Sequence, residues 1–489
     1  MKIIFIEPIF PGTVGYEVVF PFGYASLGAV LQREGHEIEY LFPIANRQRI
    51  QDVIDHISNT DADAIGIGGL LSHLPTVIEL VRLIKDVRPD IPIVLGGQMV
   101  TYTPELALKK TGADFGIAGE GEVSLSKLLN SIEYDHDYSN IPGLVFRQGG
   151  LVISNGMSEI MPLDNIPLPN WDDFPMDYYM YAGSHPIIWS DRTPKRVFTW
   201  MLSRGCPMRC NFCVSGCDSR YKTISQSIRE LKEIVSRFDP DYVIFVDNYF
   251  TRNEKYVFDL CEAFIANEFH FKFSATCRAD FVNPRLLLEM KKAGCEMIFY
   301  GLECANNDIL RFMSKGITVE QMLEALQMTK DVGIHPMVSI MFGQPGETFN
   351  DFFNSLKITL MSINSEDPVP GIPSIMPIST FPGTPIYLYA QQRGYFDSDE
   401  DYWEKYGYNS LINYNLHNYT NESIGKVIDL ANAMYRWKYY QSMADHHLKS
   451  LQELNLFYIG SKDVSPNLPI EHLSNFLDRC LRELVFGRV

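Results

Sequence analysis

Three cysteines, Cys206, Cys210 and Cys213, lie close together in the string Ser203-Arg-Gly-Cys-Pro-Met-Arg-Cys-Asn-Phe-Cys213. Their spacing is C-x3-C-x2-C, and they follow an apolar run, Val197–Leu202, that is typical of a buried strand. Cysteine is the usual ligand of iron–sulfur clusters, and a loop leaving a strand can fold three thiolates around one face of a cluster. Three protein ligands leave one iron of a four-iron cluster open. The motif therefore predicts a site at which an iron can bind a substrate or cofactor.

Two other uses of cysteine are possible for this motif. Structural zinc sites pair C-x2-C with a second Cys or His pair downstream, and no matching pair follows here. A disulfide framework is typical of small secreted domains, whereas this chain has 489 residues, nine scattered cysteines and a strand-like start at Met1–Glu7 in place of a signal peptide. Both alternatives fit less well than a cluster.

The C-x3-C-x2-C motif at the first strand of an α/β region resembles that of the radical S-adenosylmethionine (SAM) superfamily. The resemblance implies a [4Fe–4S] cluster whose open iron chelates the amino and carboxylate groups of SAM. An electron from the cluster then cleaves SAM to methionine and a 5′-deoxyadenosyl radical. It also implies an external electron donor such as flavodoxin or ferredoxin.

Composition limits the class of protein. The length predicts two or three domains, and 46% hydrophobic with 21% charged residues is typical of a soluble globular enzyme. A net charge of −18 argues against nucleic acid and against anionic lipid as partners. We expect a small-molecule substrate. No apolar run has the roughly 20 residues that a membrane helix needs. Unpaired cysteines indicate a reducing cytoplasm.

Strand and helix patterns alternate over residues 1–135, which predicts a doubly wound, Rossmann-like parallel sheet. Ligands bind such sheets beyond the carboxyl ends of the strands, where this chain has glycine-bearing turns. The dinucleotide fingerprint G-x-G-x-x-G is absent after the first strand. The predicted strands are Lys2–Ile6, His36–Phe42, Ala64–Gly68, Ile91–Gly96 and Asp114–Ala118, and the predicted helices include Gly23–Arg33 and Leu74–Val87.

Ahead of a radical SAM motif, this first third resembles the cobalamin-binding domain of the cobalamin-dependent radical SAM enzymes. The resemblance rests on Gly35-His36 before the second strand, Gly96-Gly97 with Pro104-Glu105 after the fourth, and Gly119-Glu120-Gly121-Glu122 after the fifth. It implies a set of cobalamin contacts at the strand ends. These are Gly68, Gly69, Leu70, Leu71, Ser72, His73, Gly96, Gly97, Gly119, Glu120 and Glu122.

The D-x-H-x-x-G motif that carries the lower histidine ligand of cobalt in other corrinoid proteins is missing from this chain. By the resemblance, cobalt is held without that histidine, and the residues Leu70–His73 after the third strand face the lower side of the corrin. His73 is a candidate axial ligand, although a lone histidine in such a position is more often structural.

Residues 136–195 are rich in Pro, Gly and Asp and predict a linker with one hairpin. Six strand patterns then alternate with helices over residues 196–396, which predicts a partial (β/α)6 barrel with its chemistry at the carboxyl ends of the strands. The predicted strands are Val197–Leu202, Tyr242–Val246, Lys272–Thr276, Glu296–Tyr300, Pro336–Met341 and Pro373–Ile378. The predicted helices are Ser225–Phe238, Lys255–Ala266, Pro284–Ala293, Thr318–Val332 and Thr348–Ile363.

Polar residues follow several of these strands, and each string resembles its counterpart in radical SAM barrels. The resemblance implies that Asp247 and Asn248 meet the amino group of SAM, that Arg278 pairs with its carboxylate, and that Glu303 accepts from its ribose hydroxyls. It places the adenine against Phe212, Gly343 and Gly346. For every one of these residues the alternative is a structural bond at the barrel rim.

No catalytic residue is evident beyond these. Cys217 is a candidate acid or thiol near the substrate, against the commoner case of an inert thiol. Residues 397–489 predict a mainly helical region with a long helix at Glu422–Leu451, which we interpret as a lid. His446 and His447 are adjacent on that helix and so point apart.

The predicted function is a cobalamin-dependent radical SAM methyltransferase that methylates an unactivated carbon, with the substrate between the two domains. A cyclase or rearrangement enzyme that uses the same cofactors without methyl transfer fits the sequence equally. A non-catalytic corrinoid or iron–sulfur carrier is the third possibility, and the complete cysteine triad counts against it.

Overall fold

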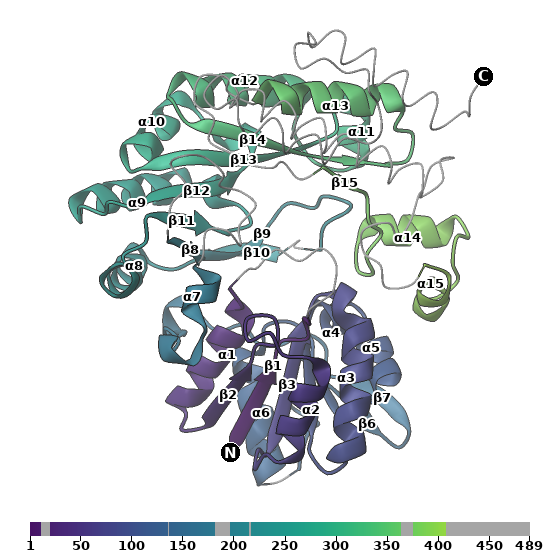
Figure 1. The fold of residues 1–489 in the computed structure, drawn as a ribbon. Coiled ribbons are helices and arrows are strands. Elements are labelled where there is room, and N and C mark those ends of the chain that lie inside the picture. The colour runs from purple at the N-terminus through teal and green to yellow at the C-terminus, as the bar shows by residue number, and fades with distance from the viewer. Residues whose placement is uncertain (11–19, 135, 181–195, 215–216, 363–374, 407–489) are drawn as a thin grey trace, which may run out of the picture. The chain divides into compact units, whose positions relative to one another are not determined.

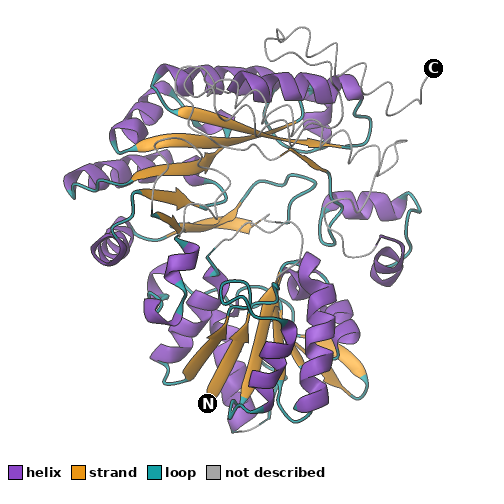
Figure 2. Ribbon diagram, in the orientation of Figure 1, coloured by secondary structure: helices purple, strands orange, loops and turns teal. Residues whose placement is uncertain are grey.

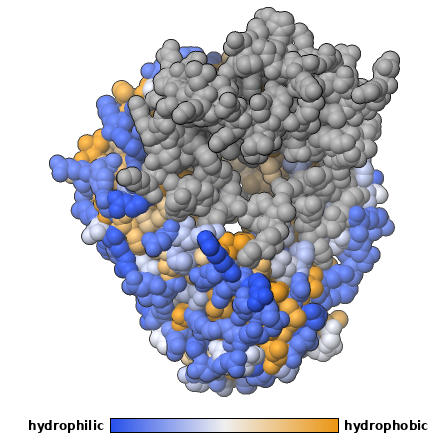
Figure 3. Space-filling view, viewed as in Figure 1, coloured by the Kyte–Doolittle hydropathy of each residue, from blue (hydrophilic) through white to orange (hydrophobic). Residues whose placement is uncertain are grey.

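The computed structural model describes residues 1–10, 20–134, 136–180, 196–214, 217–362 and 375–406 (Figure 1). These residues form two compact units. The first unit comprises the described residues of Met1–Ser184 and Phe381–Ser410, and the second comprises those of His185–Thr380. Across the described ranges, no helix has the length and apolar character needed to span a membrane. The visible described surface is largely hydrophilic with scattered apolar patches (Figure 3).

The first unit is built on a seven-stranded sheet with the strand order β2-β1-β3-β4-β5-β6-β7. Strands β1 to β5 are parallel, and the order reverses between β1 and β3, which confirms the predicted doubly wound sheet. The strands are β1 (Lys2–Ile6), β2 (Glu37–Leu41), β3 (Ala64–Gly69), β4 (Ile93–Gly97), β5 (Phe115–Ile117), β6 (Leu144–Gln148) and β7 (Leu151–Ser154).

Helices pack on this sheet because parallel strands are apolar on both faces and need cover on each. In β1, Ile3 to Ile6 are all buried, and Ile3 and Phe5 belong to a core cluster that also includes Leu125 and Leu128 of α6. The helices are α1 (Phe22–Arg33), α2 (Ile50–Ser58), α3 (Leu74–Val87), α4 (Gln98–Tyr102), α5 (Pro104–Thr111), α6 (Gly121–Glu133) and α7 (Met176–Tyr179).

The first unit is larger than the predicted domain 1–135. The predicted hairpin of the linker is β6–β7, and it extends the sheet by antiparallel pairing with β5. The segment after the last barrel strand also belongs to this unit. It carries α14 (Pro385–Gln392) and α15 (Asp399–Tyr406), and Glu400 forms ion pairs with Lys109 and Lys110 of α5 at 2.9 and 3.0 Å. Residues 381–396 therefore leave the predicted barrel.

The second unit is built on a six-stranded parallel sheet with the order β15-β14-β13-β12-β11-β8. All six predicted strands are present, and they follow one another along the chain in the predicted order. This confirms the partial (β/α)6 barrel. Figure 2 shows the long helices α8, α9, α10, α12 and α13 along one side of this curved sheet. The strands are β8 (Val197–Trp200), β11 (Tyr242–Phe245), β12 (Lys272–Cys277), β13 (Cys295–Glu303), β14 (His335–Phe342) and β15 (Ile375–Pro377).

The helices of the second unit begin and end at the signals in the sequence. Thr318 and Gln321 form the predicted capping box, and Gly333 stops the helix with φ +75°. A short helix, α11, has Asn306 as its N-cap and was not predicted. The helices are α8 (Ile224–Phe238), α9 (Glu254–Ala266), α10 (Pro284–Lys292), α11 (Asn307–Phe312), α12 (Val319–Asp331) and α13 (Phe349–Ser362). The predicted helix Glu422–Leu451, with His446 and His447, lies outside the described residues.

The carboxyl ends of β3 and β4 approach each other so closely that only glycine fits. Gly97 has φ +79° and ψ −162°, a backbone region that is essentially restricted to glycine. A Cβ atom at Gly97 would lie 2.5 Å from the carbonyl oxygen of Gly69. Glycine at this position therefore permits the close pairing of β3 with β4.

We predict that Gly97→Ala destabilises the first unit more than Gly35→Ala does. Gly35 also has positive φ, +92°, but no atom lies within 4 Å of its Cβ position, so Gly35→Ala tests the backbone strain alone. That strain amounts to roughly 1–2 kcal/mol. Urea unfolding of the two variants, followed through the transition of the first unit, measures the difference. Equal midpoints would contradict the close approach of β3 and β4.

Candidate active site

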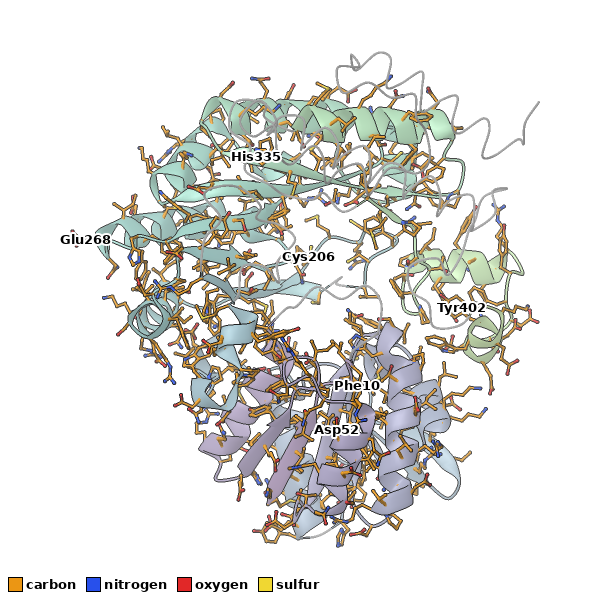
Figure 4. All side chains as sticks on the ribbon, in the orientation of Figure 1. Phe10, Asp52, Cys206, Glu268, His335 and Tyr402 are labelled. Carbon is orange, nitrogen blue, oxygen red and sulfur yellow. The ribbon has the colours of Figure 1, made fainter. Side chains whose placement is uncertain are left out.

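The cysteine motif lies in a hairpin that the sequence did not predict. Strand β9 (Ser203–Cys206) pairs antiparallel with β10 (Cys217–Tyr221), and the motif occupies the connection between them. Cys206, which is labelled in Figure 4, is the last residue of β9. Its partner across the pair is Cys217. The hairpin follows β8 directly, so the motif leaves the carboxyl end of the first barrel strand as predicted.

Asn211 fixes the motif to the end of α11. Its backbone N–H donates to the carbonyl of Met313 at 2.8 Å, and its Nδ2 donates to the carbonyl of Phe312 at 3.0 Å. Because Asn211 follows Cys210 directly, these bonds hold the middle of the motif against the barrel. Phe212 packs against the buried cluster formed by Cys304, Ile309, Leu310 and Met313.

Asp247 holds the base of the hairpin. Its carboxylate accepts hydrogen bonds from the Leu202 N–H at 3.2 Å and from the Ser203 hydroxyl. Burial raises the pKa of Asp247 to about 6. In this structure the carboxylate predicted to meet the amino group of SAM therefore binds the strand that leads into the motif, while the neighbouring Asn248 is exposed.

The three thiols of the motif are not joined by disulfides, and they differ in burial: Cys206 is half-buried, Cys210 buried and Cys213 exposed. Burial raises the pKa of Cys210, and the nearby cations Lys315 and Arg278 partly oppose that increase. Cations beside thiols favour the thiolate, which is the form that binds metal. The donor set and its charge environment therefore fit an iron–sulfur cluster.

Within the described ranges, no three His, Cys, Asp or Glu side chains are arranged around a single ion.

A buried ion pair lies beside Cys210. The Lys315 Nζ is 2.7 Å from the Glu303 Oε1, and the two side chains are only 10% and 11% exposed. Glu303 has φ +71°, at the point where the pairing of β13 with β14 shifts register. A non-glycine residue in this conformation is strained, and such strain concentrates at functional sites. Lys315 also lies 5.9 Å from the ring centroid of Phe212.

Sequence reasoning missed Lys315. It lies between α11 and the capping box at Thr318, followed by Gly316 with φ +71°. The sequence did contain one signal for Lys315, namely a lysine in a tight turn directly before the start of a helix. Its partner Glu303 is on another element, so the pairing itself required the tertiary structure.

Arg278, predicted to bind the SAM carboxylate, is also paired in this structure. Its Nε and Nη2 donate to the two carboxylate oxygens of Asp280 at 2.9 and 3.0 Å, a bidentate fork. Arg278 remains close enough to Cys210 to affect its pKa. Two acid–base pairs, Glu303–Lys315 and Arg278–Asp280, thus border the motif.

The loop after β14 contains the predicted adenine contacts Gly343 and Gly346, with φ +106° and +82°. Its backbone is held by Glu347, whose Oε2 accepts from the N–H groups of Gly343 and Gln344 at 2.8 and 2.9 Å. Burial raises the pKa of Glu347 to about 8, so this carboxyl group is largely protonated at neutral pH. The loop is therefore a pre-formed backbone surface.

The predicted cobalamin contacts of the first unit lie at the carboxyl ends of neighbouring strands. Gly68 and Gly69 end β3, and Gly96 and Gly97 end β4. The Tyr24 hydroxyl bridges β1 and β3, because it accepts from the Gly68 N–H at 2.7 Å and lies 2.7 Å from the Ile6 carbonyl oxygen. It marks the strand-order reversal at which such sheets bind ligands.

Thr101 connects the turns after β4 and β5. Its hydroxyl donates to the Gly97 carbonyl at 2.9 Å and accepts from the Gly119 N–H at 3.0 Å. Glu120 directly precedes α6, while Glu122 is buried at the start of that helix. The structure therefore brings the two turns together, with Glu122 directed into the protein.

The residues after β3 differ in what they present at this edge. Leu70 is 45% exposed, Ser72 is half-buried, and Leu71 and His73 are buried. The His73 imidazole packs beneath Gly69, and burial lowers its pKa to about 4. The exposed side chain beside the glycines that end β3 and β4 is therefore Leu70 rather than His73.

Comparison with known proteins identifies both domains. The B12 binding domain model matches residues 12–129, and the radical SAM superfamily model matches residues 200–358. The chain belongs to the cobalamin-dependent radical SAM enzymes. A [4Fe–4S] cluster, SAM and cobalamin are accordingly its cofactors, as predicted from the motifs.

Curated relatives of this radical SAM enzyme include an uncharacterized methyltransferase of Pyrococcus horikoshii, 28% identical over 72% of this chain and 76% of its own. An anaerobic magnesium-protoporphyrin IX monomethyl ester cyclase of Synechocystis is 24% identical over 83% of this chain and 80% of its own.

Two solved structures share the fold at 16% identity. One is the radical SAM methyltransferase TsrM of Kitasatospora setae with cobalamin and a [4Fe–4S] cluster, with a TM-score of 0.65 over 80% of this chain and 75% of that one. The other is the cobalamin-dependent radical SAM enzyme OxsB with aqua-cobalamin, with a TM-score of 0.73 over 98% of this chain and 72% of that one.

We predict that Lys315→Met weakens SAM binding while Lys222→Met does not. Lys222 also forms a buried pair, with Glu230 at 2.5 Å, so either variant leaves a carboxylate buried without its cation and loses roughly 3–5 kcal/mol of stability. Only Lys315 is beside Cys210 and Glu303. The measurement is the change in the cluster's electron paramagnetic resonance spectrum on titration with SAM. Equal effects of both variants would reduce Lys315 to a purely structural role.

Proposed function

We propose that this enzyme is a methyltransferase that moves a methyl group from SAM, by way of cobalamin, to an unactivated carbon of a small molecule. The observation that carries the proposal is the presence in one chain of a three-thiol motif beside buried ion pairs and of a cobalamin-binding unit with a glycine edge. Relatives named as methyltransferases support it.

The cofactors carry the difficult chemistry: when bound, they supply the radical that activates the carbon and the methyl group that replaces hydrogen. The protein positions them. Asn211 and Asp247 fix the motif at its middle and at its base, and the motif itself offers three thiolates and no fourth ligand. The partly buried site limits the access of water to reactive intermediates.

We propose roles for the residues around the motif on the basis of their contacts. Glu303 accepts from the ribose hydroxyls of SAM, as the sequence predicted. Lys315 joins Arg278 as a candidate for the SAM carboxylate, because both cations lie near Cys210. Asn248, which is exposed, is a better candidate for the amino group than Asp247, whose oxygens bind the hairpin.

At the first unit, we propose that the corrin lies against the glycine edge formed by β3 and β4, with Leu70 toward its lower face. His73 then acts as a structural residue rather than as an axial ligand. An external one-electron donor such as flavodoxin or ferredoxin reduces the cluster.

A cyclase or rearrangement enzyme is the second candidate. The observation in its favour is the similarity to anaerobic magnesium-protoporphyrin IX monomethyl ester cyclases over 83% of this chain. Such an enzyme would use the same cofactors without transferring a methyl group.

The two candidates differ in what SAM becomes. We expect the reconstituted enzyme, reduced anaerobically with titanium(III) citrate and given SAM, to release both S-adenosylhomocysteine and 5′-deoxyadenosine, because a methyltransferase uses SAM in two ways. Cys210→Ala should release no 5′-deoxyadenosine. Liquid chromatography with mass spectrometry quantifies both products. Release of 5′-deoxyadenosine without S-adenosylhomocysteine would favour the cyclase.

A further inference from the structure

Cys217 is a fourth thiol next to the motif, and the functions described above do not use it. It is the first residue of β10 and lies directly opposite Cys206, the last residue of β9. Side chains of directly opposed residues in an antiparallel pair lie on the same face of the sheet. A cluster ligand and an additional free thiol are therefore nearest neighbours across the hairpin.

The backbone geometry of this pair suits a disulfide. Directly opposed residues of antiparallel strands have Cα atoms about 4.5–5.5 Å apart. A disulfide accepts Cα separations of about 4.4–6.8 Å. The strand pairing is irregular between Cys217 and Arg220, which allows the hairpin small adjustments.

The Cys217 sulfur lies close to strand β9. Gly205 precedes Cys206, has φ +89°, and would place a Cβ atom 3.0 Å from the Cys217 Sγ. The Cys217 Sγ therefore lies against β9 at Gly205, the residue before Cys206. Glycine at position 205 leaves room for this sulfur next to the cluster ligand.

Accessibility separates Cys206, Cys213 and Cys217 from the other described thiols of the second unit. Cys217 is exposed and Cys206 half-buried, so a dissolved oxidant reaches both. Cys210 is buried and held through Asn211. The remaining described thiols, Cys261, Cys277, Cys295 and Cys304, are all buried. Cys213 is exposed, and its pairing with Cys210 is the competing outcome.

We propose that Cys206 and Cys217 form a reversible disulfide in the cluster-free protein, which makes the hairpin a redox-sensitive modification site. The inference rests on the assignment of Cys206 as a cluster ligand. While the cluster is bound, Cys206 is held on iron and cannot react. Once the cluster is lost, the disulfide withdraws one of its three ligands until a dithiol restores it.

The oxidant is a low-molecular-weight disulfide such as glutathione disulfide. The Cys217 thiolate attacks one sulfur of the oxidant and releases one small thiol, which leaves a mixed disulfide. The Cys206 thiolate then attacks the Cys217 sulfur and releases the second small thiol. Overall, the two protein thiols lose two protons and two electrons, and the oxidant gains both.

The test uses the full-length chain in two forms, reconstituted and stripped of iron by a chelator. Each form is treated anaerobically with glutathione disulfide, alkylated, digested without reductant and mapped by mass spectrometry. In the stripped form we expect peptides in which Cys206 is linked to Cys217 by a disulfide. These linked peptides should be absent from the reconstituted form, and dithiothreitol should reduce the disulfide completely. Cys213→Ser should keep the link, and Cys217→Ser should abolish it.

Two results would overturn the proposed disulfide between Cys206 and Cys217. Cys206 that stays open to alkylation in the stripped form, or that links instead to Cys210 or Cys213, would overturn the proposal. Iron uptake by untreated Cys217→Ser protein checks that this variant folds. A wild-type chain that takes up no iron before oxidant is added would contradict the cluster assignment itself, so the two failures are distinguishable.

Discussion

The structure depends on one constraint: three thiolates from a short loop must converge on a cluster while one iron stays open. A loop with that task cannot be held by the metal alone, because the chain has to leave the fourth position empty. The barrel therefore holds the loop at two points. Asn211 binds the end of α11, and Asp247 binds the strand entering the hairpin. Both anchors belong to the protein core.

Charge around the loop follows from the same constraint. Burying Cys210 disfavours its thiolate, and the cations Lys315 and Arg278 oppose that cost. Buried cations need partners in turn, and Glu303 and Asp280 provide them. The site is thus a balanced set of charges before any cofactor binds, and a charged ligand such as SAM can exchange with partners already present. The strained backbone of Glu303 is a consequence of placing its carboxylate in this set.

Regular elements were predictable because their signals are local. Helix α3 has the predicted bounds Leu74–Val87, and the six barrel strands follow their apolar runs. The hairpin β9–β10 was missed because its strands, such as Cys217–Tyr221, are polar and lack alternation. The place of Phe381–Ser410 was missed because it depends on contacts such as Glu400 with Lys109, which are distant in sequence. The ion pair of Lys315 with Glu303 and the hydrogen bond from Leu202 to Asp247 were missed for the same reason, because each joins residues that are distant in sequence.

The most direct test is to count iron and cobalamin in the chain. Anaerobic reconstitution with iron, sulfide and hydroxocobalamin should give about four irons and one cobalamin per chain. The variant with Cys206, Cys210 and Cys213 all changed to Ala should lose the iron and keep the cobalamin. Iron that stays bound to that variant would contradict the cluster assignment. A wild-type chain that binds four irons but no cobalamin would contradict the role of the first unit, and the methyltransferase proposal with it.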